Sequence, residues 1–305
     1  MSLENMTAAL GGAEQPGAAA PAAAEAPGRV RLRAFTDNRL AVAGLAVVIV
    51  LTAFAFVGPL LYHTDQIHTR LAMETLRPGP GRPLGTDNVG YDQLGRLMVG
   101  GQITLEVAFG AAAVAILLGV VWGATAGYLG GFADGLMMRV VDALLAIPAL
   151  FLLIFLATVF KPSVLMLIIV VGVTAWLVPA RLVRGEALSL RNREYVQAAR
   201  TMGVRPPTII FRHIVTNSIG TILVNATFQV ADAILLVAAL SFLGLGISPP
   251  ATNWGAMLSD GLNYTYSGYW WLTYPPGIAI VLTVVAFNLV GDGLRDAFGL
   301  DTRRG

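Results

Sequence analysis

The sequence predicts an all-α integral membrane protein with six transmembrane helices and both termini in the cytoplasm. Three observations support this prediction: an apolar composition, six long apolar stretches and an uneven distribution of basic residues. Of the 305 residues, 56% are hydrophobic and only 12% are charged, whereas soluble domains carry about 25% charged residues. Cysteine is absent, which excludes disulfide bonds and cysteine-based catalysis.

The six apolar stretches are each long enough to cross a bilayer, which requires about 20 residues in a helix. They lack the alternation of apolar and polar residues that is typical of a half-buried strand. A helix also satisfies its own backbone hydrogen bonds in lipid, which an isolated strand does not. The predicted spans cover residues 40–62, 105–129, 140–160, 163–181, 219–247 and 272–292.

The basic residues predict the orientation of these spans. With the N-terminus inside, the cytoplasmic segments carry fifteen basic residues and the outer segments carry five. Cytoplasmic loops of membrane proteins are enriched in Lys and Arg, so this arrangement is favoured over the opposite one. Residues 249–274 are rich in Trp and Tyr, which predicts an aromatic belt at the outer membrane–water interface. Aromatic packing inside a loop is the alternative.

Composition and span positions divide the chain into four segments. Residues 1–38 begin with a stretch rich in Ala, Pro and Gly and without the features of a signal peptide, and we expect a disordered cytoplasmic tail. The first transmembrane helix and an outer loop occupy 39–104, and a core of five transmembrane helices occupies 105–295. A cytoplasmic C-terminal tail follows over 296–305.

One cytoplasmic stretch, EYVQAARTMGVRPP (194–207), is far more polar than its surroundings and predicts a short helix that ends at its glycine. Tyr195, Ala198, Ala199 and Met202 follow a spacing of i, i+3, i+4 and i+7, which predicts one apolar face. A DNA-binding helix-turn-helix is disfavoured because membrane spans adjoin the stretch on both sides and leave no room for a DNA-binding core. An amphipathic connector on the membrane surface is the simpler alternative.

The order of Glu194, Ala198, Ala199 and Gly203, with an isoleucine eleven residues later, resembles the E-x-x-x-A-A-x-x-x-G-x(n)-I-x-x-P signature of permease subunits of binding-protein-dependent ABC importers. The resemblance implies that residues about 193–204 form a coupling helix that seats in a groove of the ATP-binding subunit. The tyrosine on this helix is then expected to take part in the same contact.

Four further segments resemble the C-type permeases of dipeptide, oligopeptide and nickel importers. With the coupling signature, the resemblance covers about residues 35–300 and implies the type I ABC importer permease fold. The four segments are 82–105, 137–153, 240–258 and 275–298.

A polar stripe runs along the fifth predicted span. Asn225, Gln229 and Asp232 are spaced i, i+4 and i+7 and therefore share one face of a helix. A charged side chain in lipid costs about 2.5–3.5 kcal/mol on insertion scales, so this face is expected to line a polar translocation pathway. The alternative is a set of interhelical hydrogen bonds that hold the bundle together, each worth about 0.6–2 kcal/mol.

The resemblance implies a transmembrane permease subunit of an ATP-driven importer that translocates peptides or similar small solutes across the bacterial cytoplasmic membrane. It implies as partners a second homologous permease chain, two ATP-binding subunits and an extracytoplasmic solute-binding protein, all acting at the lipid bilayer. No nucleic-acid partner is expected.

The chain itself is not expected to be an enzyme. It contains no ATP-binding loop of the Gly-x-x-x-x-Gly-Lys-Ser/Thr type, so ATP and Mg²⁺ are expected in the partner subunits. The three histidines lack the spacing of metal ligands, and no cofactor or metal site is predicted in this chain. A secondary transporter or channel that works without ATP is the alternative, since an intramembrane carboxylate such as Asp232 can carry protons.

Overall fold

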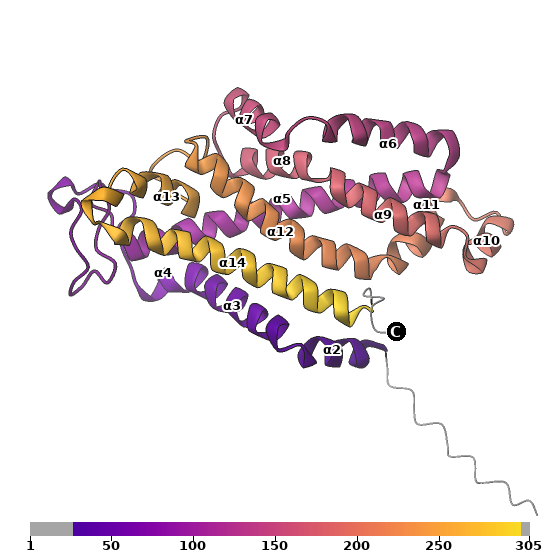
Figure 1. The fold of residues 1–305 in the computed structure, drawn as a ribbon, viewed down its shortest axis with the longest axis horizontal. Helices are drawn as coiled ribbons and strands as arrows, with labels where there is room; N and C mark the ends of the chain where they lie inside the picture. Colours follow the sequence, from indigo (N-terminus) through magenta and orange to yellow (C-terminus); the bar gives the residue numbers. More distant parts are fainter. Residues whose placement is uncertain (1–26, 300–305) are drawn as a thin grey trace, which may run out of the picture.

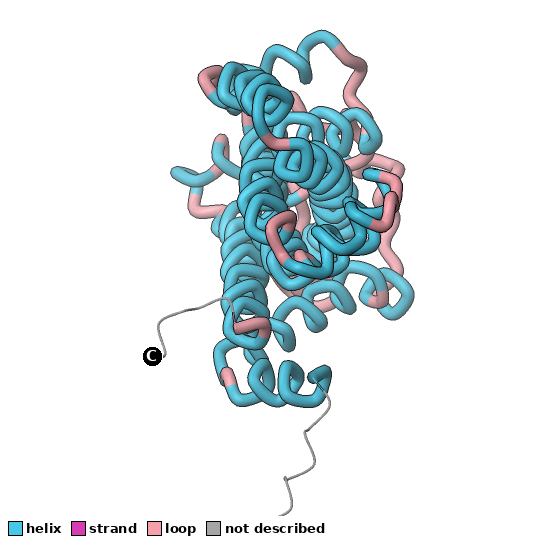
Figure 2. The backbone as a smooth tube through the Cα atoms, turned by 90° about the vertical axis from the view of Figure 1, so that its right-hand side faces the viewer, coloured by secondary structure: helices cyan, strands magenta, loops and turns pink. Residues whose placement is uncertain are grey.

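A computed structural model describes residues 27–299 as a bundle of helices, most of which run roughly along one common direction (Figures 1 and 2). Within this range every regular element is helical, so the predicted all-α class is confirmed. The outermost parts of the two expected tails, residues 1–26 and 300–305, lie outside the described residues. Pro27–Asp37, which the sequence placed in the disordered tail, forms helix α2.

Four helices are long and apolar enough to cross a membrane: α3 (Arg39–Phe56), α5 (Gln93–Leu129), α12 (Ile219–Phe242) and α14 (Trp270–Ala297). Two bent pairs pass the same test: α6 (Gly131–Leu145) with α7 (Ala149–Val159), and α8 (Val164–Ala175) with α9 (Leu177–Leu190). When each bent pair is counted as one span, the described residues contain the six predicted spans. The third span is not the continuous helix expected over 140–160, because its two halves meet at 80°.

Shorter helices lie at the two ends of the bundle: α4 (Gly58–Leu61), η1 (Leu71–Met73), α10 (Glu194–Thr201), α11 (Pro206–Ile209), η2 (Ile210–Val215), α13 (Trp254–Leu262) and η3 (Thr265–Ser267). The loop after α4 and helix α13 lie at one end, on the left in Figure 1. Helices α2 and α10 and the described C-terminal end lie at the other end. This is the arrangement that the predicted orientation requires.

Prolines explain both bends. Pro148 directly precedes α7 and separates it from α6. In the second pair, Pro179 lies four residues after Ala175, and since proline has no N–H, the Ala175 carbonyl has no helical donor. The helix axis turns by 45° at this point.

The central helix α5 packs against α9 through a row of glycines, Gly119, Gly123 and Gly127, which recur every four residues. A methyl group at Gly123 would overlap the Ala180 carbonyl oxygen of α9. Small residues at this spacing let two membrane helices approach until their backbones touch. At these three positions the contact between α5 and α9 therefore accommodates glycine but no larger residue.

The aromatic segment near the outer end divides into core and surface residues. Trp254 and Trp271 are buried, and the Trp254 indole donates a hydrogen bond to the Leu97 carbonyl at 2.9 Å. Tyr266 and Trp270 are exposed. The exposed residues suit the predicted interfacial belt, whereas the two buried tryptophans belong to the core.

Candidate cytoplasmic docking helix and membrane-embedded cavity

Helix α10 lies beyond the end of the bundle, between α9 and the segment that returns to α12 (Figure 1). Its last turn closes when the Val204 N–H donates to the Ala199 carbonyl at 3.1 Å and the Gly203 N–H donates to the Arg200 carbonyl at 3.0 Å. Gly203 has φ of +76°, the left-handed conformation expected at such a helix end. A Cβ atom there would meet nothing within 4 Å, so the backbone angle, and not lack of space, favours glycine.

The structure corrects the predicted apolar face of α10. Val196 and Ala199 point inward and are 0% and 3% exposed, respectively. Tyr195, Ala198 and Met202 form a separate apolar face that is exposed to solvent. The helix therefore has one face held by the bundle and a second apolar face that is exposed to solvent, where the centre of the Tyr195 ring lies 6.2 Å from that of the His213 ring.

Two arginines fix α10 to the end of α5. Arg200 donates to the Tyr128 carbonyl at 3.2 Å, and its guanidinium lies 4.4 Å from the centre of the Tyr128 ring. Arg191, which precedes α10, donates to the Gly127 carbonyl at 3.3 Å. The last carbonyls of a helix have no helical donors and carry partial negative charge, so cationic donors stabilise them. As a result α10 is attached to the central helix of the bundle.

The link from α10 to α12 is also packed. Ile209 and Ile214 are fully buried in the same apolar cluster as Val196 and Ala199. Residues 210–215 form a π-helix, an uncommon form that is frequent at functional sites. Glu194 is exposed at the first turn of α10, where a carboxylate complements the helix dipole.

The three residues of the predicted polar stripe have different environments. Gln229 is buried, Asn225 is partly buried and Asp232 is exposed. The Asn225 Oδ1 atom is enclosed and has no hydrogen-bond partner among the described residues. The spacing in the sequence therefore predicted that the three residues share one face of the helix, but not that their burial differs.

Gln229 has a structural partner. Its side-chain amide donates to the Ala175 carbonyl at 3.0 Å, the carbonyl that Pro179 leaves without a helical donor. A buried carbonyl without a partner is costly in a membrane, where water cannot replace the missing donor. Gln229 thus stabilises the bend between α8 and α9, as the hydrogen-bonding alternative expected.

A cavity of about 370 Å³ lies beside this bend. Its wall combines the bend between α6 and α7, the bend between α8 and α9, and the middle of α12. Gln229 and Asp232 both line it, and most of the remaining wall consists of Ala, Leu and Val side chains. The structure therefore brings the carboxylate of Asp232 together with two helix breaks that are distant from it in sequence.

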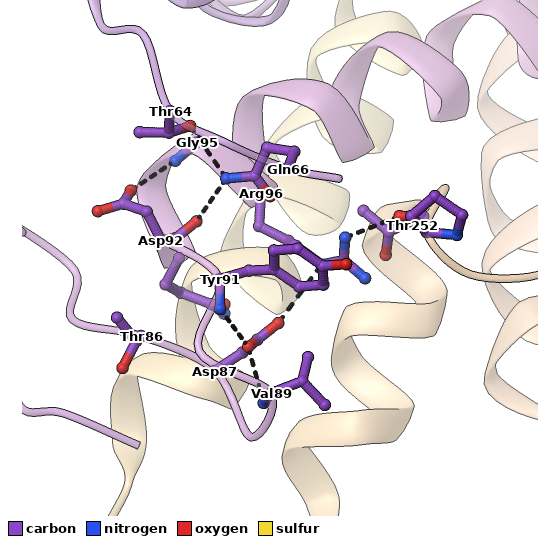
Figure 3. A network of polar contacts seen from close by, with 12 residues as sticks. Thr64, Gln66, Thr86, Asp87, Val89, Tyr91, Asp92, Gly95, Arg96 and Thr252 are labelled. Atoms are coloured by element: carbon purple, nitrogen blue, oxygen red, sulfur yellow. Dashed lines mark hydrogen bonds and ion pairs between the residues drawn. The ribbon is translucent and has the colours of Figure 1, made fainter. Parts of the chain in front are cut away.

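The outer end contains a buried polar network that the sequence did not reveal (Figure 3). Arg96, in the first turn of α5, lies 3.5 Å from the Asp87 carboxylate and donates to the Pro250 carbonyl at 2.8 Å. Its guanidinium also stacks 4.4 Å from the centre of the Tyr91 ring. The network ties the outer loop and the segment before α13 to α5. In the sequence Arg96 was only one of the five basic residues assigned to the outer segments.

Burial perturbs the acids near this network. Burial raises the pKa of Asp87 above its ordinary value, while the N–H groups of Val89 and Tyr91 and the charge of Arg96 oppose the rise. Burial likewise raises the pKa of Asp260, which lines the same small cavity as Arg96. Burial and a hydrogen bond to Asp92 together raise the pKa of Tyr62 to about 12. In all three groups partial burial opposes the charged form.

The sequence matches a family described as "Binding-protein-dependent transport system inner membrane component" over residues 115–304. It also matches the "N-terminal TM domain of oligopeptide transport permease C" over residues 27–78. The two matches together span most of the chain.

Several similar proteins carry the names of peptide permeases. The oligopeptide transport system permease protein OppC of Bacillus subtilis (strain 168) is 39% identical over 88% of this chain and 88% of its own length. The dipeptide transport system permease protein DppC of the same organism is 39% identical over 89% of this chain and 85% of its own length. OppC of Escherichia coli (strain K12) is 42% identical over 87% of this chain and 88% of its own length.

Proposed function

Because the chain belongs to the family of binding-protein-dependent transport system inner membrane components, we propose that it is a permease subunit of an ATP-driven importer for peptides. It is a multi-pass protein of the bacterial inner membrane. The names of its relatives, oligopeptide and dipeptide permeases, support peptides as the solute class. The observation that carries the proposal is the combination of an exposed, firmly attached cytoplasmic helix with a largely apolar cavity beside α12 that contains one carboxylate.

In this proposal α10 is the contact for an ATP-binding subunit. The exposed apolar face formed by Tyr195, Ala198 and Met202 would be buried in a groove of that subunit, with Glu194 at its edge. Arg191 and Arg200 transmit movement of α10 to α5 because they bind the last carbonyls of α5. ATP and Mg²⁺ bind in the partner subunits.

Coupling requires that the contact at α10 differ between the two states of the importer. A ligand that binds both states equally well shifts no equilibrium. The ATP-binding subunits must therefore grip α10 more tightly in one state, and Gly203 sets the direction in which α10 leaves the bundle. A second permease chain, two ATP-binding subunits and an extracytoplasmic solute-binding protein complete the assembly.

The proposed translocation pathway passes the cavity beside α12. Asp232 supplies its charge, Gln229 holds the neighbouring bend, and Asn225 continues the same face toward the α10 end. Half-helices that break near the middle of the membrane are a recurrent way to build solute sites in transporters. The two bent pairs fit this pattern.

Affinity purification of the tagged chain from its native membrane tests the proposal. We expect a near-stoichiometric ATP-binding protein and a second six-span chain by mass spectrometry, and ATP-dependent peptide uptake once the purified complex is placed in liposomes with its binding protein. Isolation of the chain alone, under conditions that preserve other membrane complexes, would contradict the importer. It would favour a carrier that works without ATP.

A further inference from the structure

Asp232 is an unpaired carboxylate on the wall of the cavity between the two bent helix pairs. Its side chain is exposed to the cavity, and neither a hydrogen bond nor an ion pair joins it to any of residues 27–299. A carboxylate inside a membrane bundle is expensive unless it is paired or serves a ligand. The unpaired carboxylate of Asp232 is thus available to bind a ligand that enters the cavity.

Two ion pairs join α6 and α9, two helices that border the cavity. Arg184 donates two hydrogen bonds to the Asp134 carboxylate, and Arg181 donates to Asp142. None of these four residues lines the cavity, and no basic residue does. At each bend the C-terminus of one helix, with its partial negative charge, lies next to the N-terminus of the following helix, with its partial positive charge. The two helix dipoles therefore add little net charge to the cavity. Asp232 is therefore the one fully charged group on the described cavity wall.

The rest of the wall suits an organic solute. Leu145, Leu177, Val178, Leu235 and Leu236 present apolar surface around the carboxylate. A volume of about 370 Å³ is within the range of about 300–1,000 Å³ that is typical of small-molecule sites. One charge set in apolar walls favours a ligand with one cationic group and apolar parts, which describes the amino-terminal end of a short apolar peptide.

We propose that Asp232 binds the ammonium group of a peptide during its passage, while the leucine and valine side chains contact the first side chains of the peptide. This inference rests on the proposed function, since it names the part of the transported solute that the pathway recognises. The free amino terminus and a lysine side chain offer the same ammonium chemistry, so the test uses a peptide without basic side chains.

The test compares the complete importer with and without the Asp232 charge. Uptake of one such peptide into liposomes is measured for the wild-type chain and for Asp232→Asn, normalised to the amount of assembled complex. A charge-assisted hydrogen bond is worth about 1.5–3 kcal/mol, so the wild-type rate should exceed the variant rate by about 10- to 150-fold near pH 7. The ratio of the two rates removes any preference of the shared binding protein.

The peptide amine then serves as an internal control. Its pKa is about 7.7–8.0, so the ratio should fall toward one as the pH rises to about 9, and it should be near one at every pH for the N-acetylated peptide. Asp232→Glu should keep most of the wild-type uptake. Leu235→Asn, which adds polarity to the same wall without charge, should give a ratio that does not change with pH or acetylation.

Two outcomes would overturn the inference: equal uptake by wild type and Asp232→Asn, or a ratio that is the same for free and acetylated peptides at all pH values. In both cases wild-type, ATP-dependent uptake would leave the proposed function intact. Absence of peptide uptake by the assembled wild-type complex would instead contradict the proposed function.

Discussion

Two glutamine side chains compensate for prolines at different places in the bundle. In α14, Pro275 cannot donate to the Trp271 carbonyl, and the Gln93 amide donates to that oxygen at 3.2 Å. Gln229 does the same at the bend between α8 and α9. A buried carbonyl without a partner costs about 1–3 kcal/mol. Each glutamine thus offsets a loss that proline imposes on a helix.

Replacement of Gln229 by leucine should therefore reduce stability more than transport. We expect a loss of about 1–2 kcal/mol, seen as a lower midpoint of thermal denaturation, because the Ala175 carbonyl loses its donor. Uptake per assembled complex should stay close to the wild-type value. Gln93→Leu, outside the cavity, is the matched control and should show a similar loss of stability. Loss of uptake without loss of stability would instead indicate that Gln229 contacts the solute in the translocation pathway.

Arg96 stabilises the buried carboxylate of Asp87 at the outer end of the bundle. Arg96→Ala leaves Asp87 without its cation, and the loss of one partner from a buried pair costs about 3–5 kcal/mol. Because burial already raises the pKa of Asp87 in the folded protein, ionisation of this group opposes folding at pH values above that pKa. The penalty shrinks as the pH falls below the folded-state pKa and disappears only below the ordinary pKa that the group has in the unfolded chain.

The stability deficit of Arg96→Ala should therefore be largest at neutral pH and shrink toward acidic pH. Thermal denaturation between about pH 5 and pH 8 measures it. The double variant Arg96→Ala/Asp87→Asn should be more stable than Arg96→Ala at neutral pH and depend less on pH, with the remaining dependence due to Asp260. A deficit that is constant over this range would show that the Arg96 packing, and not its charge, is what matters.

At the scale of single elements, α10 combines firm attachment with exposure. Its inner face is buried and its neighbouring arginines bind the end of α5, whereas its outer face is exposed to solvent, with Tyr195 beside the His213 ring. Secondary-structure propensity alone makes an eight-residue helix marginal in water. The attachment to the bundle is what presents the outer face in a fixed orientation.

Glu194→Lys and Gly203→Val should both lower solute uptake while the chain still inserts in the membrane. The first reverses a charge at the exposed first turn, and the second forces a β-branched residue to adopt φ of +76°, a strain of about 1–3 kcal/mol that reorients α10. Uptake and ATPase activity of the reconstituted complex measure the effect. Asp37→Lys, the same type of charge change on cytoplasmic helix α2, is the control. Wild-type uptake in both α10 variants would exclude a docking role for α10.

The seam between α5 and α9 tests packing at the scale of a helix pair. Gly123→Ala places a methyl group against the Ala180 backbone, so we expect a loss of about 1–3 kcal/mol. Gly135→Ala, at an exposed and open position of α6, should gain up to about 1 kcal/mol because alanine favours helix. Thermal denaturation of the two variants should therefore shift in opposite directions, and equal shifts would contradict the close seam.

At the scale of the whole molecule, charge and structure point to one orientation. The segments with most of the arginines, including α10, lie at the end opposite the outer loop and α13 (Figure 1). Arg96 donates a hydrogen bond to the Pro250 carbonyl at the outer end, and Arg200 donates one to the Tyr128 carbonyl at the inner end. Both ends of the bundle are thus held by cations that bind backbone carbonyls.

The absence of cysteine in the sequence allows a direct test of this orientation. In spheroplasts, a membrane-impermeant maleimide should label Tyr266→Cys, an exposed position at the outer end. Leu32→Cys, exposed on helix α2 at the cytoplasmic end, should be labelled only after the membrane is permeabilised. The reverse pattern would invert the predicted topology.

Local sequence was sufficient to predict much of the fold and part of the site. Long apolar runs predicted the spans because the bilayer demands helices about 20 residues long. Gly203 was predicted as a helix end because its spacing and residue type are local properties. The apolar face of α10 was predicted wrongly at Ala199, because the choice between its two apolar faces depends on which one meets the bundle.

The sequence by itself determined the all-α class, the number of spans and the family, since all three depend on composition and on short patterns along the chain. Tertiary structure alone decided that the third span bends by 80°, that Gln229 serves the Ala175 carbonyl and that Asp232 lines a cavity. The contacts of Gln229 and Asp232 depend on partners that are far apart in sequence, and although Pro148 marks the break in the third span, a proline alone does not set the angle between the two helices. A one-dimensional pattern gives the face of a helix, but only packing determines what that face meets.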